Sequence, residues 1–205
     1  FQILVQIGDM NIMEIMADTT NRIAEGEVLQ LINKNNPNSS EQSYMQVIEN
    51  KTAILFQAAA QCGAMLTDAD EETQNALKEF GMELGIAFQL IDDVLDYDGD
   101  AESMGKNIGD DLAEGKPTLP LIYAMEHGTD SEAELIRECL KDEELSKKSL
   151  DQVINIVRDS GGLAYTREKA RDCSDKALAC LDKIPASNYR DALEAMVEFS
   201  KERKS

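Results

Sequence analysis

The sequence predicts an all-α fold, and three observations support this prediction. Aromatic residues make up only 5% of the 205 residues and tryptophan is absent, while Ala, Leu, Ile, Met and Glu are plentiful, a balance that favours helices. Apolar residues recur with the helical period in successive segments, and no segment alternates as a half-buried strand does. Because 42% of the residues are hydrophobic, the chain can bury a core as a single domain over residues 1–205.

Capping and turn residues separate the helices predicted in the first half of the chain. These helices cover residues 10–33, 41–50, 53–66 and 73–97. Asp9 can cap the first of them. Its apolar stripe includes Met13 and Met16, and Glu27 and Gln30 interrupt it, which alone is typical of a solvated flank. Lys51, at the mouth of the apolar third helix, alone is typical of a surface residue.

Two glycines lie four residues apart inside the predicted helix over 73–97, at Gly81 and Gly85. Each glycine costs roughly 1 kcal/mol of helix stability relative to alanine. We therefore expect close contact there with a neighbouring helix or a ligand. After a loop over 99–118, further amphipathic helices are predicted. They cover residues 120–127, 131–140, 146–159, 163–183 and 188–202.

Charge and composition exclude several classes of function. The formal net charge of -20 disfavours a nucleic-acid surface or a basic membrane anchor, because neither phosphates nor anionic lipids attract such a chain. No long apolar span or signal peptide is evident, which predicts a cytoplasmic protein. The cysteines have no C-x-x-C spacing, so we expect free thiols in a reducing compartment. They are Cys62, Cys139, Cys173 and Cys180.

A dense group of charged residues follows the apolar part of the helix that carries the two glycines. Asp92 and Asp96 lie one helical turn apart on one face, with Asp93 beside them. Like charges this close raise one another's pKa, and a hard divalent cation relieves the repulsion by taking carboxylate oxygens. Lys106 and Lys116 follow in a glycine-rich loop. The pattern predicts a site for a metal-bound polyphosphate.

Blander or different interpretations fit this group less well. A calcium loop beginning at Asp96 fails because Ala101 stands where the sharp turn needs glycine. A P-loop fails because Pro117 stands where Ser or Thr holds magnesium. Nucleophilic hydrolysis finds little support, since His127 is the only histidine and no G-x-S-x-G motif occurs. A solvated helix end is disfavoured because apolar residues surround the carboxylates.

The residues of this stretch resemble those of a known family. FQLIDDVLD, followed by MGKNIGDDLAEGKPTLP, is similar to the second aspartate-rich motif of the trans-polyprenyl diphosphate synthases and the loop after it. The similarity extends to GDM at 8–10, ADTTNRIAEGEVLQL at 17–31 and KTA at 51–53, and so covers most of the chain. The G-E-x-x-Q order at 26–30 resembles the long-chain members.

The resemblance implies an isoprenoid synthase helical bundle and a transferase activity. Isopentenyl diphosphate would be condensed with an allylic diphosphate, from a farnesyl primer, to a long-chain all-trans polyprenyl diphosphate. The expected product is an octaprenyl chain for the side chains of quinones, ubiquinone or menaquinone, and the expected assembly is a homodimer. The expected cofactor is Mg2+, held by Asp92 with Asp93 and Asp96 as further ligands, water-mediated ligands or supporting groups.

The resemblance also implies roles for residues outside the aspartate group. Lys51, Lys106 and Lys116 would hold the allylic diphosphate, and Thr52 and Gln89 would turn oxygen dipoles toward the developing cation. Two pairs of residues on the helix over 10–33 have further roles. Glu27 and Gln30 would form a supporting network, and Met13 and Met16 would line the product tunnel.

One departure from the family pattern shapes these expectations. The first aspartate-rich motif of the family, and its Gly-Lys-Arg segment, have no match in this sequence, which starts inside an apolar run without Met. We therefore expect the chain to be the C-terminal two-thirds of the fold, inactive by itself. The alternative is a non-catalytic partner subunit of a heteromeric synthase. A terpene cyclase ranks third, because it shares the fold but not the G-K-x-x-G-D-D-L loop.

Overall fold

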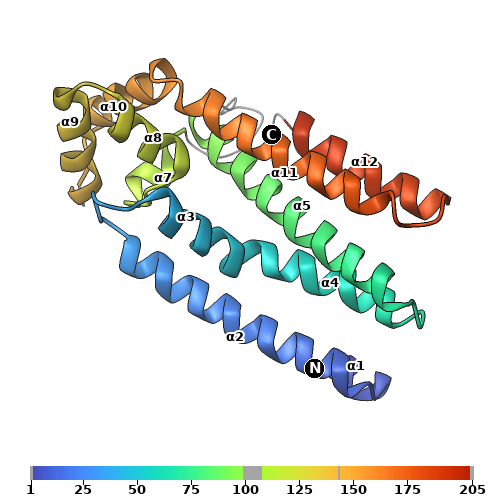
Figure 1. Cartoon of the computed structure of the whole chain (residues 1–205). Coiled ribbons are helices and arrows are strands. Elements are labelled where there is room, and N and C mark those ends of the chain that lie inside the picture. The colour runs from blue at the N-terminus through green and yellow to red at the C-terminus, as the bar shows by residue number, and fades with distance from the viewer. Residues whose placement is uncertain (1, 99–107, 143, 204–205) are drawn as a thin grey trace.

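The chain is built from helices throughout the part that the structure describes, which confirms the predicted all-α class. The computed structural model describes residues 2–98, 108–142 and 144–203, and no strand occurs in these ranges. Figure 1 shows the long helices α2, α4, α5, α11 and α12 side by side along a bundle, with the shorter helices α7 to α10 gathered at one end. None of the described helices has the length and apolar character that crossing a membrane requires.

The helices follow the chain in a simple order. In the first half they are α1 (Gln2–Ile7), α2 (Met10–Asn33), α3 (Glu41–Ile48), the π-helical turn η1 (Glu49–Ala53), α4 (Ile54–Met65) and α5 (Glu71–Asp98). In the second half they are α7 (Asp110–Ala113), α8 (Leu119–His127), α9 (Asp130–Lys141), α10 (Lys147–Asp159), α11 (Gly162–Leu181) and α12 (Asn188–Glu202). The predicted helices all occur, most of them with ends within two residues of the expected ones.

Three short elements differ from the sequence-based expectation. α1 and α7 were not expected as helices, and both are too short to show a helical apolar period. The two helices predicted over 41–50 and 53–66 are joined by η1 rather than separated. Caps were predicted better: Asp9 accepts a hydrogen bond of 2.8 Å from the backbone amide of Asn11, and so caps α2 as expected.

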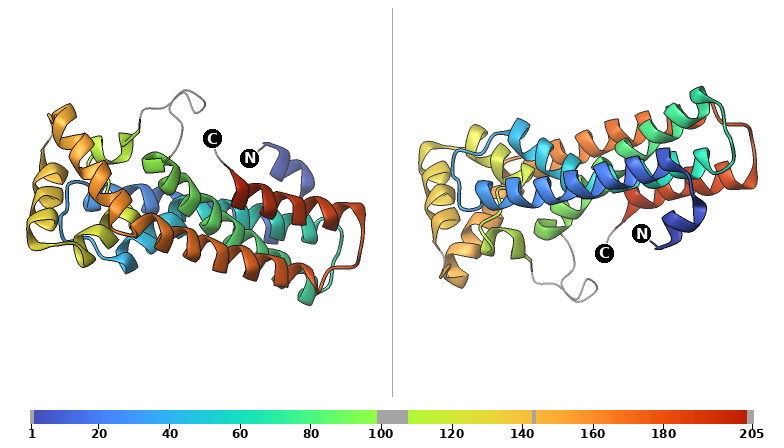
Figure 2. Two further views of the ribbon diagram at one scale, coloured as in Figure 1. Left: turned by 90° about the horizontal axis from the view of Figure 1, so that it is seen from above. Right: turned by 90° about the horizontal axis from the view of Figure 1, so that it is seen from below.

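Helix α5 forms the centre of the core. Its residues Ala87, Leu90 and Val94 are fully buried, and the apolar side chains around them come from α3, η1, α8, α9, α10 and α11. A second apolar cluster joins the first half of α5, through Phe80 and Leu84, to α11 and α12. In both views of Figure 2 α5 lies among the other long helices rather than at an edge. The residues at the end of α5 are therefore held by a helix packed on several sides.

The glycines of α5 permit close contact with neighbouring helical backbone, which confirms the sequence-based expectation of a helix contact. A Cβ atom at Gly81 would lie 2.4 Å from the carbonyl oxygen of Phe56 in α4. One at Gly85 would lie 2.6 Å from the Cα atom of Ala53 in η1. Any side chain at these positions would force the elements apart, so the intrinsic cost of glycine in the helix is offset by close packing.

The cysteines behave as the sequence predicts. All four are free thiols. Cys139, Cys173 and Cys180 are buried, and Cys62 is partly exposed. Burial raises the pKa of Cys173 to about 12, and the neighbouring carboxylate of Glu83 acts in the same direction. These thiols therefore contribute packing rather than reactivity.

We expect Gly81→Ala to destabilise the protein by about 1–3 kcal/mol, because the added methyl group overpacks the contact between α5 and α4. Gly63→Ala is the matched control, since a Cβ atom at Gly63 in α4 meets no atom within 4 Å. The control should stabilise the protein by about 0.5–1 kcal/mol through helix propensity. Urea unfolding followed by circular dichroism measures both effects, and equal shifts in the two variants would contradict the packing argument.

Candidate functional site

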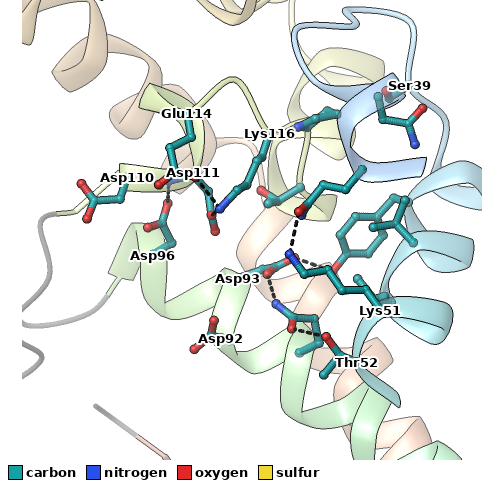
Figure 3. Close-up of a pocket in the computed structure, with 18 residues that line it drawn as sticks. Ser39, Lys51, Thr52, Asp92, Asp93, Asp96, Asp110, Asp111, Glu114 and Lys116 are labelled. Atoms are coloured by element: carbon teal, nitrogen blue, oxygen red, sulfur yellow. Dashed lines mark hydrogen bonds and ion pairs between the residues drawn. The ribbon is translucent and has the colours of Figure 1, made fainter. Parts of the chain in front are cut away.

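One cavity of about 330 Å³ opens where α2, α3, η1, α5, α7 and the segment after α7 meet. Figure 3 shows its walls, with acidic and basic side chains facing one another across it. Most of the side chains predicted for the site line this cavity. They are Gln30, Lys51, Thr52, Gln89, Asp92, Asp93, Asp96 and Lys116. Residues from segments far apart in the sequence are therefore brought together as the motif analysis expected.

Three of the remaining predicted residues lie outside the lining of the cavity, and the structure does not describe the fourth. Glu27 is not part of the cavity wall but is paired with Lys51. Met13 and Met16 are half-buried on α2 and outside the lining of the cavity. Lys106 lies outside the described residues. Their predicted roles therefore remain predictions.

The π-helical turn η1 presents Lys51 and Thr52 to the cavity. Isolated π-helical turns often occur at functional sites, since the extra residue shifts side chains around the helix axis. Here η1 is clamped between two helices at glycines. A Cβ atom at Gly26 of α2 would lie 2.6 Å from the amide nitrogen of Lys51, and one at Gly85 of α5 would be as close to the Cα atom of Ala53. The direction of both side chains is thus fixed by contacts with neighbouring helices.

Lys51 is held by polar side chains of α2. Its Nζ atom donates a hydrogen bond of 2.6 Å to Oε1 of Gln30 and lies 3.3 Å from Oε1 of Glu27. Gln30 and Glu27 sit one helical turn apart, so both reach the same ammonium group. The pair therefore contacts Lys51, and its role as a supporting network stays a prediction.

A hydrogen-bonded chain connects Asp93 to Thr52. The hydroxyl of Thr52 donates to Oε1 of Gln89 over 3.2 Å, and Nε2 of Gln89 donates to Oδ1 of Asp93 over 2.8 Å. The hydroxyl of Tyr44 in α3 donates to Oδ2 of Asp93 over 2.5 Å. Burial raises the pKa of Asp93 to about 8, aided by the charge of Asp111 and opposed by these hydrogen bonds.

A second polar group surrounds Asp96, where α5 meets α7. The backbone amide of Asp111 donates to Oδ2 of Asp96 over 3.2 Å. Burial raises the pKa of Asp96 to about 7, and the charges of Asp111 and Asp110 add to the rise. Lys116 lies 2.9 Å from Oδ1 of Asp111 and 2.7 Å from Oε2 of Glu114. Burial lowers the pKa of Lys116, but Asp111 and Glu114 raise it by more than burial lowers it, so the pKa lies above its ordinary value.

Asp92 has a different environment from its neighbour in the sequence. Its carboxylate is partly exposed and lies 3.4 Å from the guanidinium of Arg203, beyond the end of α12. The same guanidinium lies over the ring of Phe88, 4.8 Å from its centroid. The side chain of Asp92 is therefore the most accessible carboxylate of the predicted group of three.

The carboxylates of the cavity are the type of ligand that a hard divalent cation prefers, but in the part of the chain that the structure describes they are not arranged around one point. Carboxylate oxygens are the ligands that Mg2+ and Ca2+ prefer, and the cavity is lined by Asp92, Asp96, Asp110 and Asp111. Burial raises the pKa of Asp96, and the charges of Asp111 and Asp110 add to the rise, so a bound cation would relieve the repulsion between these acids. Within the described residues, however, no three such side chains already surround one point. Figure 3 shows Asp92, Asp93 and Asp96 leaving α5 in different directions.

Some of the residues on the wall were missed by sequence reasoning. Asp110, Asp111 and Glu114 line the cavity, although the sequence analysis assigned them to a loop without a role of their own. Their place directly between the two predicted lysines was the available signal. Tyr44 and Ser39 also line the cavity, and nothing in the local pattern distinguishes them from ordinary helix and cap residues.

Comparison with known proteins finds relatives that match most of this chain. The family model described as Polyprenyl synthetase matches residues 1–157. The octaprenyl diphosphate synthase of Escherichia coli (strain K12) is 45% identical over 203 residues, which cover 99% of this chain and 62% of that protein. An all-trans-nonaprenyl-diphosphate synthase (geranyl-diphosphate specific) of Rhodobacter capsulatus is 42% identical over 203 residues, again 99% of this chain and 62% of that protein.

A solved structure shows the same fold. The polyprenyl synthase from Caulobacter crescentus CB15, crystallised in complex with calcium and isoprenyl diphosphate, superposes with a TM-score of 0.95 at 40% sequence identity. The match covers 100% of this chain and 62% of that chain. The chain thus spans less than two thirds of the length of these relatives.

In metal-free buffer we expect the free energy of unfolding to fall as the pH rises from about 4 to about 8. The folded pKa values of Asp93 and Asp96, about 8 and about 7, lie above the ordinary value of 3.8. The folded protein therefore binds these protons more tightly than the unfolded chain, and this stabilisation disappears as the pH rises through the folded values.

Asp93→Asn should flatten this pH dependence, whereas Asp151→Asn, at an exposed position on α10, should leave it unchanged. Urea unfolding at a series of pH values measures both variants against the unaltered protein. Parallel curves for all three proteins would show that the buried carboxyl does not contribute.

Proposed function

This chain belongs to the polyprenyl synthetase family, and on that premise we propose that the protein condenses isopentenyl diphosphate with an allylic diphosphate. The product is a long-chain all-trans polyprenyl diphosphate. The observation that carries the proposal is the cavity in which Lys51, Thr52, Gln89 and the aspartates of α5 meet. The names of the octaprenyl and nonaprenyl relatives support a long chain.

The reaction needs a leaving diphosphate and a carbocation to be stabilised in one place. The C–O bond of the allylic diphosphate breaks and the diphosphate leaves with the electron pair. The double bond of isopentenyl diphosphate then forms the new C–C bond, and a proton is lost to the diphosphate. Lys51 and Lys116 on the cavity wall stabilise the leaving group by fixed positive charge, and Lys106 is proposed to join them.

The oxygen atoms of Thr52 and Gln89 stabilise the positive charge. They lie 3.2 Å apart in one hydrogen bond, on η1 and α5. Oxygen dipoles fixed before the reaction lower the energy of a developing cation without reorganising. Glu27 and Gln30 keep the ammonium of Lys51 in place through their contacts at 3.3 Å and 2.6 Å.

We propose Mg2+ as the metal of the intact enzyme. Asp92 and Asp96 are the residues that would hold it, because both line the cavity and Asp92 is partly exposed. When bound, the metal neutralises the charge of the diphosphate as a Lewis acid. The relative from Caulobacter crescentus, solved with calcium and isoprenyl diphosphate, supports a divalent ion beside such a substrate.

The finer details of the proposal concern product and assembly. We propose a farnesyl primer, an octaprenyl product destined for quinone side chains, a homodimer and a cytoplasmic location. The growing chain is proposed to run along α2, where Met13 and Met16 are half-buried. Incorporation of labelled isopentenyl diphosphate by the full-length natural protein, with product sizing, tests the whole proposal. No product, together with binding to a second synthase subunit, would identify a non-catalytic partner instead.

We expect Lys51→Ala in the full-length protein to lower kcat/KM by about 10²–10³, because a fixed positive group facing the diphosphate is lost. Lys78→Ala is the control, since Lys78 is exposed on α5. Labelled isopentenyl diphosphate incorporation gives the rates, and circular dichroism verifies that both variants are folded. Undiminished turnover of the Lys51 variant would remove this residue from the mechanism.

Met16→Ala should shift the products toward longer chains, because a smaller side chain leaves more room along the proposed tunnel. Ile3→Ala, at an exposed position on α1, serves as the control for a general effect of apolar truncation. Chromatography of the dephosphorylated products measures their length distribution. An unchanged distribution in the Met16 variant would place the tunnel wall elsewhere.

A further inference from the structure

We propose that Tyr44 is a positioning residue that fixes which end of the Gln89 side-chain amide faces the reacting carbon. The inference rests on the proposed function, because it concerns the same cavity. It assigns Asp93 to the orientation of Gln89 rather than to metal binding. It also gives a role to a tyrosine on α3 that no motif identifies.

The contacts form one continuous path across three elements. Tyr44 of α3 donates to Oδ2 of Asp93 over 2.5 Å, and Nε2 of Gln89 donates to Oδ1 of Asp93 over 2.8 Å. Oε1 of Gln89 then accepts from the hydroxyl of Thr52 in η1 over 3.2 Å. We name this path, from Tyr44 through Asp93 and Gln89 to Thr52, the Tyr44 relay.

Both oxygens of Asp93 are occupied within the protein. The residue is 2% exposed, and its two hydrogen-bond partners lie on different helices, one on α3 and one on its own helix α5. Asp92, one residue earlier, is partly exposed. Since a metal ligand needs an accessible oxygen, the geometry separates these neighbours into an accessible carboxylate and an anchored one.

The anchored carboxyl determines the direction of the Gln89 dipole. The two ends of an amide have nearly the same shape and opposite hydrogen-bonding character, so only the neighbours decide which way the group points. With Nε2 toward Asp93, the amide oxygen is turned to Thr52 and the cavity. A reversed amide would turn its NH2 group there, and the positive end of the dipole would repel a cation instead of stabilising it.

Tyr44 is required because it holds the carboxylate that faces Gln89. Its hydroxyl donates to Oδ2 of Asp93, which leaves Oδ1 directed at Nε2 of Gln89. Carboxylate oxygens accept hydrogen bonds, so the NH2 end of the amide is the matching donor. Without the hydroxyl, the carboxylate can turn about its Cβ–Cγ bond, and Oδ1 is no longer held beside Gln89.

The test compares Tyr44→Phe with Tyr165→Phe in the full-length protein. Tyr165 is a matched control, because its hydroxyl also donates to a carboxylate, that of Glu41 on α3, over 2.7 Å. We expect Tyr44→Phe to lower kcat by about 10- to 100-fold with KM within about twofold, since misoriented groups cost up to about 10² in rate. Tyr165→Phe should leave both constants unchanged.

A binding measurement separates orientation from a general structural defect. An allylic diphosphate analogue with an ammonium group at the reacting carbon should bind Tyr44→Phe about tenfold more weakly than the unaltered protein. An uncharged thiodiphosphate analogue should bind both equally. In a Gln89→Ala background, Tyr44→Phe should cause no further loss of kcat, because the group that it orients is gone.

The outcomes distinguish the two proposals. An unaltered full-length protein without prenyl transfer would overturn the proposed function. An active protein in which Tyr44→Phe keeps normal kcat, or in which both analogues lose affinity equally, would overturn the inference alone. If circular dichroism shows that Tyr44→Phe does not fold, Asp93→Asn replaces it. In Asp93→Asn the NH2 group of the new side chain can face Gln89, so the same loss of kcat is expected. Normal kcat would overturn the inference.

Discussion

The contact of η1 with two helices through glycine is the constraint on which the rest of the site depends. Gly26 on one side and Gly85 on the other leave no room for a methyl group, as a Cβ atom at either would lie 2.6 Å from backbone atoms of η1. Because packed interiors do not yield to such overlap, the turn is held in one position. Lys51 on η1 consequently meets Gln30 of α2, and Thr52 meets Gln89 of α5.

Electrostatic repulsion is the second organising feature of the cavity. Burial raises the pKa of Asp96 and the charges of Asp111 and Asp110 raise it further, while the nearby cations lie beside carboxylates: Lys116 beside Asp111 and Arg203 beside Asp92. Under the proposed function, a diphosphate or a divalent ion that enters the cavity would exchange these internal ion pairs for ion pairs of its own.

The sequence predicts the parts of this structure that depend on local pattern. The helix over 10–33 and the helix over 188–202 agree with α2 and α12 at both ends, because caps and apolar period coincide there. The aspartates of α5 were found because they stand close together in one sequence motif, D-D-x-x-D. The turn η1 was not predicted, since it is imposed by packing against Gly26 and Gly85. Tyr44 was missed because its partner Asp93 is 49 residues away.

The aspartate-rich motif shows why residues with the same letter need not share a role. Successive positions on a helix point about 100° apart, so Asp92 and Asp93 enter different surroundings although they are neighbours. Asp92 reaches the partly exposed side near Arg203, whereas Asp93 turns inward to Tyr44. Asp96, one turn later, meets the backbone amide of Asp111. The spacing places all three on one cavity, and only the elements packed around α5 decide which is open to a ligand and which supports a neighbour.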